Sequence, residues 1–88
     1  MGKSWCVYIL QCADGTFYTG VTNDIGHRLK MHSNGTGAKY TRGRGPVKLC
    51  YRECANSHGE ALRREYAIKQ LKKADKIKLI ATYTPEDL

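Results

Sequence analysis

The sequence predicts a small α+β domain, a three-stranded antiparallel sheet flanked by helices in the order β-β-α-β-α-α. Three observations lead to this fold class. Two short runs of aromatic and β-branched residues meet at Ala13-Asp14-Gly15, a third run alternates from Val47 to Ala55, and helix-capping residues follow the second and third runs. At 88 residues the chain is expected to form one domain over residues 1–88, with a frayed tail at 83–88.

In the hairpin over residues 5–21, the length of the turn determines which side chains share a face. A two-residue loop, Asp14-Gly15, puts Tyr8 and Tyr18 on opposite faces, whereas a three-residue loop with a left-handed glycine pairs Tyr8 with Gly20. We favour the longer loop because it alone gives one coherent apolar face. That face consists of Trp5, Val7, Ile9, Phe17, Thr19 and Val21. The two tyrosines then share the other face, with Gly20 between them and open space above it.

Two basic residues lie one turn apart on the helix predicted after this hairpin. Ile25, Arg28, Leu29 and His32 follow i, i+3, i+4, i+7 spacing and share one side of that helix. Two interpretations stay open from the spacing. Arg28 and His32 are either neighbouring surface residues or a functional pair at the rim of the packed face.

The helix predicted over residues 58–73 begins after Ser57, its expected N-cap, and carries one candidate functional carboxylate. Glu65 lies about 40° from Ala61 and about 60° from Ile68 on a helical wheel. It is therefore at the edge of an apolar stripe made of Ala61, Ala67, Ile68 and Leu71. It either faces a cleft between helix and sheet or forms an exposed pair with Lys69. A last helix over 75–81 presents Ile77, Leu79 and Ile80 to the core.

The third strand alternates in the same way as the hairpin strands. Val47, Leu49 and Tyr51 are expected on one side of it, and Lys48, Cys50, Arg52 and Cys54 on the other. The four cysteines include no Cys-x-x-Cys pair, which favours small buried side chains over a zinc site.

The charge balance points to a polyanionic partner. The net charge is +7, from 15 Lys and Arg against 8 Asp and Glu, and this suggests nucleic acid or an acidic membrane surface. The glycine-rich loop over 33–46 adds candidate nucleic-acid contacts: Lys39, Tyr40, Arg42 and Arg44. No apolar run is long enough for a membrane span, so we expect a cytoplasmic protein with reduced cysteines.

The motifs together resemble a known family. Cys6-Val7-Tyr8, followed ten residues later by Tyr18-Thr19-Gly20, resembles the paired tripeptides of the GIY-YIG nuclease family, and is closest to its small stand-alone bacterial members. Arg28, His32 and Glu65 fall in order at the family's arginine, His-or-Tyr and metal-binding glutamate positions.

The resemblance implies a small endonuclease that hydrolyses phosphodiester bonds in DNA. Branched or damaged DNA is one candidate substrate. It implies Mg²⁺ or Mn²⁺ bound by Glu65. We expect the protein to act as a monomer and without a small-molecule cofactor. Arg28 would stabilise charge on the phosphate, and Tyr8, Tyr18 or His32 would serve as general base, with Tyr18 preferred. Gly20, between the two tyrosines, is included among the candidate nucleic-acid contacts.

The sequence departs from the family pattern in two places. Only the two tyrosines and the final glycine of the tripeptides are kept, and the asparagine that many members carry after the glutamate helix is missing. The corresponding stretch holds lysines, and Lys72 or Lys76 could contact phosphate there. The alternative function is therefore a non-catalytic nucleic-acid-binding module on the same scaffold.

Overall fold

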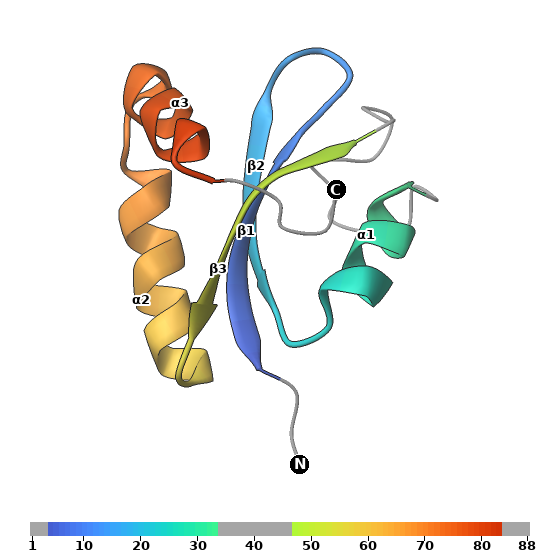
Figure 1. Cartoon of the computed structure of the whole chain (residues 1–88), viewed down its shortest axis with the longest axis vertical. Helices are drawn as coiled ribbons and strands as arrows, with labels where there is room; N and C mark the ends of the chain where they lie inside the picture. The colour runs from blue at the N-terminus through green and yellow to red at the C-terminus, as the bar shows by residue number, and fades with distance from the viewer. Residues whose placement is uncertain (1–3, 34–46, 84–88) are drawn as a thin grey trace.

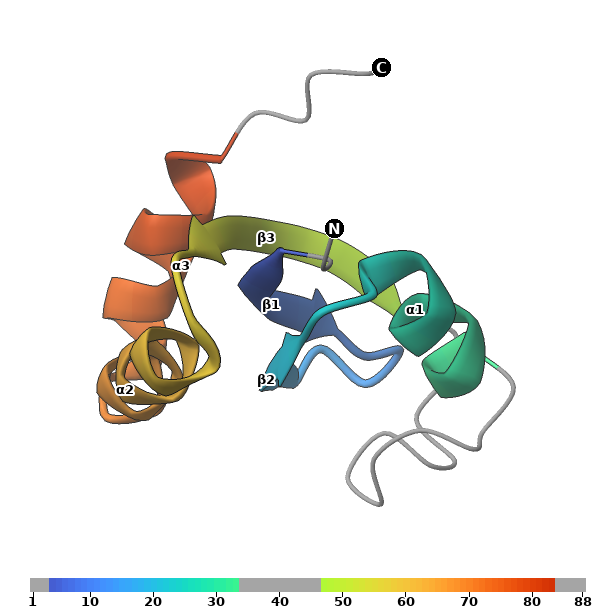
Figure 2. The same ribbon diagram turned by 90° about the horizontal axis from the view of Figure 1, so that it is seen from below.

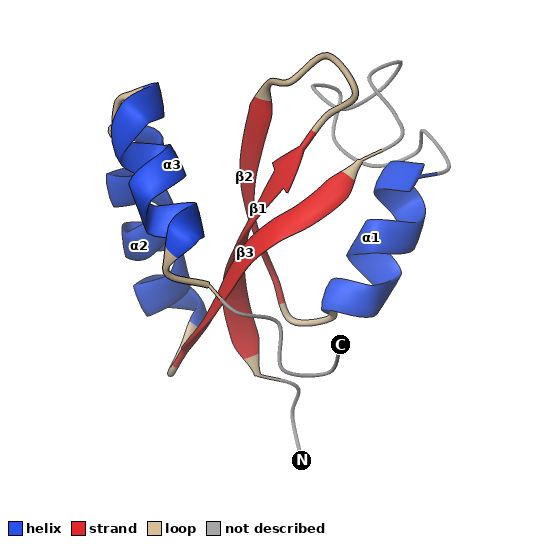
Figure 3. Ribbon diagram, turned by 45° about the horizontal axis from the view of Figure 1, so that its top comes forward, coloured by secondary structure: helices blue, strands red, loops and turns tan. Residues whose placement is uncertain are grey.

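The computed structural model describes residues 4–33 and 47–83, and it confirms the predicted fold class (Figure 1). The elements in chain order are β1 (Trp5–Gln11), β2 (Phe17–Thr22), α1 (Ile25–Ser33), β3 (Lys48–Ala55), α2 (His58–Lys69) and α3 (Lys73–Ala81). The sheet has the strand order β2-β1-β3, with all pairs antiparallel. In Figures 2 and 3 the sheet lies between α1 on one side and the α2–α3 pair on the other. Among the described helices, none is long and apolar enough to cross a membrane.

The hairpin has the three-residue loop, as predicted. Tyr8 pairs with Gly20 and Leu10 with Tyr18. The Cys12 N–H donates to the Thr16 carbonyl at 2.8 Å, and Gly15 adopts a φ of +85°, a left-handed conformation that glycine reaches without a Cβ penalty. The turn therefore fixes which face each strand residue occupies, and both tyrosines fall on the face next to α1.

The core lies on the opposite face, between the sheet and α2–α3. Its buried members are Val7, Ile9, Tyr51, Ala61 and Ile68. The predicted contributions of Ala67 and Ile77 to the apolar core are wrong, because Ala67 is exposed and Ile77 is 50% exposed. The inward side of α2 follows a strict i, i+3, i+4, i+7 pattern, so half-buried Arg64 and Glu65 occupy the positions between Ala61 and Ile68.

A bulge in β3 changes the predicted alternation of that strand. Ile9 pairs with Tyr51, but Leu10 pairs with Leu49, so Cys50 is an extra residue on the β3 side. Because cross-strand partners share a face, Leu49 lies on the face of Leu10 and Tyr8 rather than on the core face with Tyr51. The expectation that Leu49 and Tyr51 share a face is therefore wrong.

The helix predicted over 58–73 is interrupted. α2 ends at Lys69, where the Gln70 N–H bonds to the carbonyls of Tyr66 and Ala67, and the Leu71 N–H bonds to that of Ile68 at 3.0 Å. The bonds from Gln70 to Ala67 and from Leu71 to Ile68 span three residues instead of four, which tightens the last turn and ends it without a glycine or a proline. α3 then begins at Lys73, two residues earlier than expected.

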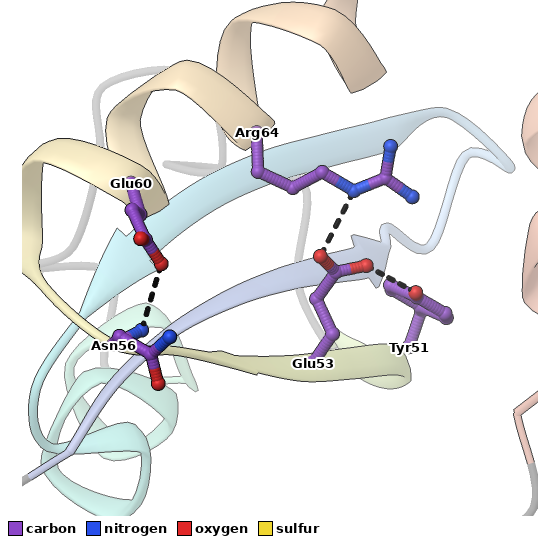
Figure 4. Close-up of polar contacts among 5 residues, drawn as sticks. All are labelled: Tyr51, Glu53, Asn56, Glu60 and Arg64. Carbon is purple, nitrogen blue, oxygen red and sulfur yellow. Dashed lines mark hydrogen bonds and ion pairs between the residues drawn. The ribbon is translucent and has the colours of Figure 1, made fainter.

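Polar contacts hold α2 against β3 (Figure 4). The Arg64 Nε donates to Glu53 at 2.9 Å, and the Tyr51 hydroxyl donates to the other oxygen of the same carboxylate. Burial and hydrogen bonding to Glu53 both raise the pKa of Tyr51, so this hydroxyl stays protonated and remains a donor. At the start of α2, the Ser57 hydroxyl accepts from the Glu60 N–H, which confirms the predicted N-cap.

Candidate active site

The face next to α1 brings two tyrosines and a histidine from three elements into contact. Tyr8 comes from β1, Tyr18 from β2 and His32 from the last turn of α1. The Tyr8 hydroxyl lies 3.1 Å from His32 Nε2, and the His32 ring centre is 5.3 Å from that of Tyr18. The ring centres of the two tyrosines are 6.3 Å apart. The predicted placement of both tyrosines on one face is confirmed.

Local capping explains why α1 presents His32 to the sheet. The Asp24 carboxylate accepts from the His27 N–H at 3.2 Å, and the Asp24 N–H donates to the Thr22 hydroxyl. Asp24, rather than Asn23 or Thr22, is thus the N-cap that sets the helix phase. In this phase His32 is 1% exposed, so the interpretation of Arg28 and His32 as mere surface neighbours is wrong.

Gly20 is required by the position of Tyr8. A Cβ at residue 20 would lie 2.5 Å from the Tyr8 hydroxyl oxygen, 2.7 Å from Tyr8 Cζ and 3.0 Å from Tyr18 Cε2. The open space expected above Gly20 is therefore filled by Tyr8, whose side chain has no exposed surface. A contact of Gly20 itself with nucleic acid stays a prediction.

Burial sets the protonation of the two hydrogen-bonded groups. Burial raises the pKa of Tyr8, and hydrogen bonding from Arg28 only partly opposes this rise. Burial, followed by the charge of Arg28, lowers the pKa of His32 from its ordinary 6.5. At neutral pH the structure therefore holds a neutral phenol against a neutral imidazole, with a permanent cation beside both.

Arg28 supplies that cation. Its side chain is half-buried on α1, one turn before His32, and its guanidinium reaches Tyr8. Within residues 4–33 and 47–83, its buried Nε–H has no hydrogen-bond acceptor. A buried donor without an acceptor is costly, so this group is suited to an anionic oxygen brought by a ligand.

Glu65 lies on α2, the helix on the other side of the sheet from α1. Its carboxylate forms an ion pair with Lys69 at 3.3 Å and is 19% exposed. The pair considered from the sequence is thus present, although Glu65 itself is half-buried. Its convergence with Tyr8 and Arg28 and its role as a metal ligand stay predictions.

The remaining predicted contacts fall in two places. Lys72 is the exposed N-cap residue of α3, without a side-chain capping bond. The loop residues Lys39, Tyr40, Arg42 and Arg44 lie outside the described residues.

Sequence reasoning missed the position of Arg52. It is exposed and pairs directly with Tyr8 across β1 and β3, so it adds a second guanidinium to the face of the tyrosines. The alternation of the third strand placed Arg52 on the right side but could not give its partner.

This combination of fold and site defines the class of protein. The model of the GIY-YIG catalytic domain matches residues 4–78, so the chain belongs to the GIY-YIG family, a nuclease superfamily whose members generally use divalent metals. Within this superfamily the chain resembles the UPF0213 proteins. It is 51% identical over 80 residues to the UPF0213 protein OB0043 of Oceanobacillus iheyensis, covering 91% of this chain and 93% of that protein. It is 56% identical over 70 residues to the UPF0213 protein VNG_2274C of Halobacterium salinarum, covering 80% and 91% of the two chains.

Solved structures agree with this assignment. The solution structure of the UPF0213 protein BH0048 from Bacillus halodurans is similar with a TM-score of 0.60 and 44% identity, covering 94% of this chain and 88% of that chain. The solution structure of EF2693 from E. faecalis gives a TM-score of 0.59 and 35% identity, covering 100% and 99%. Both have lengths close to that of the present chain.

Proposed function

We propose that this protein is a divalent-metal-dependent endonuclease that hydrolyses phosphodiester bonds in DNA. The observation that carries the proposal is the Arg28 guanidinium beside Tyr8, whose buried Nε–H lacks an acceptor among the described residues, in a fold of the nuclease superfamily. A phosphate oxygen has the charge and geometry to satisfy such a donor. The net charge of +7 favours approach to a polyanion of this kind.

The chain's own residues divide the chemistry between them. Arg28 neutralises the charge that develops on the phosphate oxygens during in-line attack. Tyr18 is the base we favour, because its side chain is half-buried, whereas the Tyr8 hydroxyl is fully buried and hydrogen-bonded to His32. Since burial also raises the pKa of Tyr8, this residue orients His32 rather than accepting a proton from water.

Glu65 is the residue we assign to metal binding. Within the described part of the chain, no group of three or more His, Cys, Asp and Glu side chains could hold an ion together. A single carboxylate fits Mg²⁺ or Mn²⁺ if water and substrate phosphate provide the other ligands. Such an ion, when bound, supplies Lewis-acid stabilisation of the scissile phosphate.

Cleavage of DNA tests the proposal directly. Supercoiled plasmid and a branched DNA substrate are incubated with the protein in Mg²⁺ or Mn²⁺, and in EDTA. We expect nicking that requires the metal. Arg28→Ala should lower the cleavage rate by about 100-fold or more, the scale seen when a charge-stabilising group is removed. Lys30→Ala, an exposed cation on the same helix, is the matched control and should cleave normally.

A second pair of variants separates catalysis by Glu65 from a purely local ion pair. Glu65→Gln should bind DNA normally and stop cleaving, whereas Lys69→Ala, which breaks the same ion pair, should keep its activity. Equal and small effects of both variants would contradict the metal-binding role. Salt-sensitive binding without cleavage of any substrate would refute the endonuclease and leave the nucleic-acid-binding module.

A further inference from the structure

Two thiols lie opposite each other on the face of the tyrosines. Cys6 of β1 and Cys54 of β3 are direct cross-strand partners. Both are free cysteines, but their surroundings differ: Cys6 is 5% exposed, whereas Cys54 is exposed to solvent. One thiol can thus meet a reagent in solution, and the other lies behind it in the sheet.

The hydrogen-bond phase of β1 determines how close these side chains are. The Cys12 N–H points to β2, because it donates to the Thr16 carbonyl. Backbone groups of a strand point to alternate edges, so Cys6, in the same phase as Cys12, also directs its N–H and C=O to β2. Its pair with Cys54 on the β3 side is therefore a non-hydrogen-bonded pair. In such pairs the Cα atoms are about 4.5 Å apart and the side chains are closest. This separation is within the range of about 4.4–6.8 Å that disulfides span.

The surroundings of the two thiols give them different reactivities. Burial raises the pKa of Cys6, the Arg52 guanidinium partly opposes this rise, and the adjacent Cys54 adds to it. Cys6 therefore stays protonated and unreactive until a partner sulfur is presented to it. Cys54 is the accessible thiol of the pair.

We propose that Cys54 and Cys6 form a peroxide-reactive dithiol site, in which Cys54 is the reacting cysteine and Cys6 the resolving cysteine. The Cys54 thiolate attacks a hydroperoxide oxygen, the O–O bond breaks, and Cys54 becomes a sulfenic acid while the peroxide leaves as water or an alcohol. The Cys6 sulfur then attacks the Cys54 sulfur, the S–O bond breaks, and the thiol proton of Cys6 leaves with the hydroxyl group as water. The two thiols lose two electrons and two protons in total, and the peroxide is reduced.

The resulting disulfide would join β1 to β3 two residues from Tyr8. Such a bond in a reducing compartment is transient and reports on redox conditions. The proposal rests on the strand register and thiol exposure, and it stands whether or not the protein cleaves DNA.

Peptide mapping after oxidation tests this site. The full chain is treated with hydrogen peroxide, digested without reductant and analysed by mass spectrometry. We expect a Cys6–Cys54 linked peptide, an intact mass lower by two hydrogen atoms, and complete reversal by dithiothreitol. Cys50→Ser is the matched control on the same strand and should form the same link.

Single variants keep the proposal falsifiable. Cys54→Ser, a change at an exposed position, should abolish the loss of thiols, and Cys6→Ser should let Cys54 proceed to sulfinic acid. A wild-type chain that accumulates Cys54 sulfinic acid with Cys6 still a free thiol would overturn the proposal. A covalent dimer through Cys54, or a link from Cys54 to Cys50, would also overturn it.

Discussion

Replacing Gly20 with alanine tests the packing on which the site depends. The added Cβ would lie 2.5 Å from the Tyr8 hydroxyl oxygen and 2.7 Å from Cζ, distances that real Cβ contacts essentially never show. Tyr8 is fully buried, so its ring cannot swing away without disturbing His32 or the sheet. Overpacking of this kind costs about 1–3 kcal/mol, and alanine regains about 0.5–1 kcal/mol over glycine in a strand. We expect a net loss of about 1–2 kcal/mol in the free energy of unfolding.

Thermal and urea unfolding measure this loss. For a chain of this size the expected decrease in Tm is about 4–16 °C, because each kcal/mol corresponds to about 4–8 °C. Gly26→Ala is the matched control. The nearest atom to a Cβ added at residue 26 is Asp24 Oδ1 at 3.9 Å, and alanine favours the helix, so this variant should be neutral or slightly stabilised.

A spectroscopic readout shows whether Tyr8 moves. The imidazole nitrogen resonances of His32 should shift in Gly20→Ala, because the hydrogen bond to the Tyr8 hydroxyl is broken or lengthened. A Gly20→Ala protein with wild-type Tm and unchanged His32 resonances would refute the close approach of Tyr8 to Gly20.

Three further predictions follow from contacts described above. The free energy of unfolding should fall as the pH drops below 7, by at most about 1.4 kcal/mol per pH unit, because the unfolded chain protonates His32 near pH 6.5 and the folded chain, whose His32 pKa is lowered, protonates it only at lower pH. The difference from His32→Asn in urea titrations isolates this effect, and equal slopes would contradict it. Glu53→Gln should lower the free energy of unfolding by about 0.5–1.5 kcal/mol, since it weakens the hydrogen bond from Arg64. In a double-mutant cycle, Arg64→Met should cause little further loss of stability when Glu53 is already replaced. Ser57→Ala should cost about 1 kcal/mol through the lost bond to the Glu60 N–H, whereas Ser57→Gly should cost only a few tenths, as measured by urea unfolding.

The hairpin and the side of α1 that faces the sheet could be predicted because local patterns determine them. Strict alternation permits one register that keeps Val7 and Ile9 on the same face as Val21, and that register requires the loop with left-handed Gly15. Helical spacing in turn placed Arg28 and His32 together. These patterns depend on neighbours close in sequence.

The rest depends on contacts between distant segments. No residue type in the third strand signals the bulge at Cys50, so the face of Leu49 could not be read from the alternation. The pairing of Arg52 with Tyr8 depends on the register between β1 and β3, which alternation within one strand does not determine. Nor does any glycine or proline mark the end of α2 at Lys69. Burial of Tyr8 could not be predicted either, since it requires α1 to lie over the strand. The catalytic and metal-binding roles stay predictions, to be decided by the cleavage assays.

The central position of β1 determines which part of the site can move. This strand is paired along both edges, and the side chains from Val7 to Leu10 have no exposed surface, so Tyr8 can be displaced only if the sheet itself opens. Its hydroxyl lies against His32 of α1, and the same helix carries Arg28. Amide hydrogen exchange should be slowest along β1 and faster in α1. The tyrosine thus belongs to the strand enclosed on both edges, whereas the cation and the imidazole share one helix, so any displacement of that helix would move both groups together.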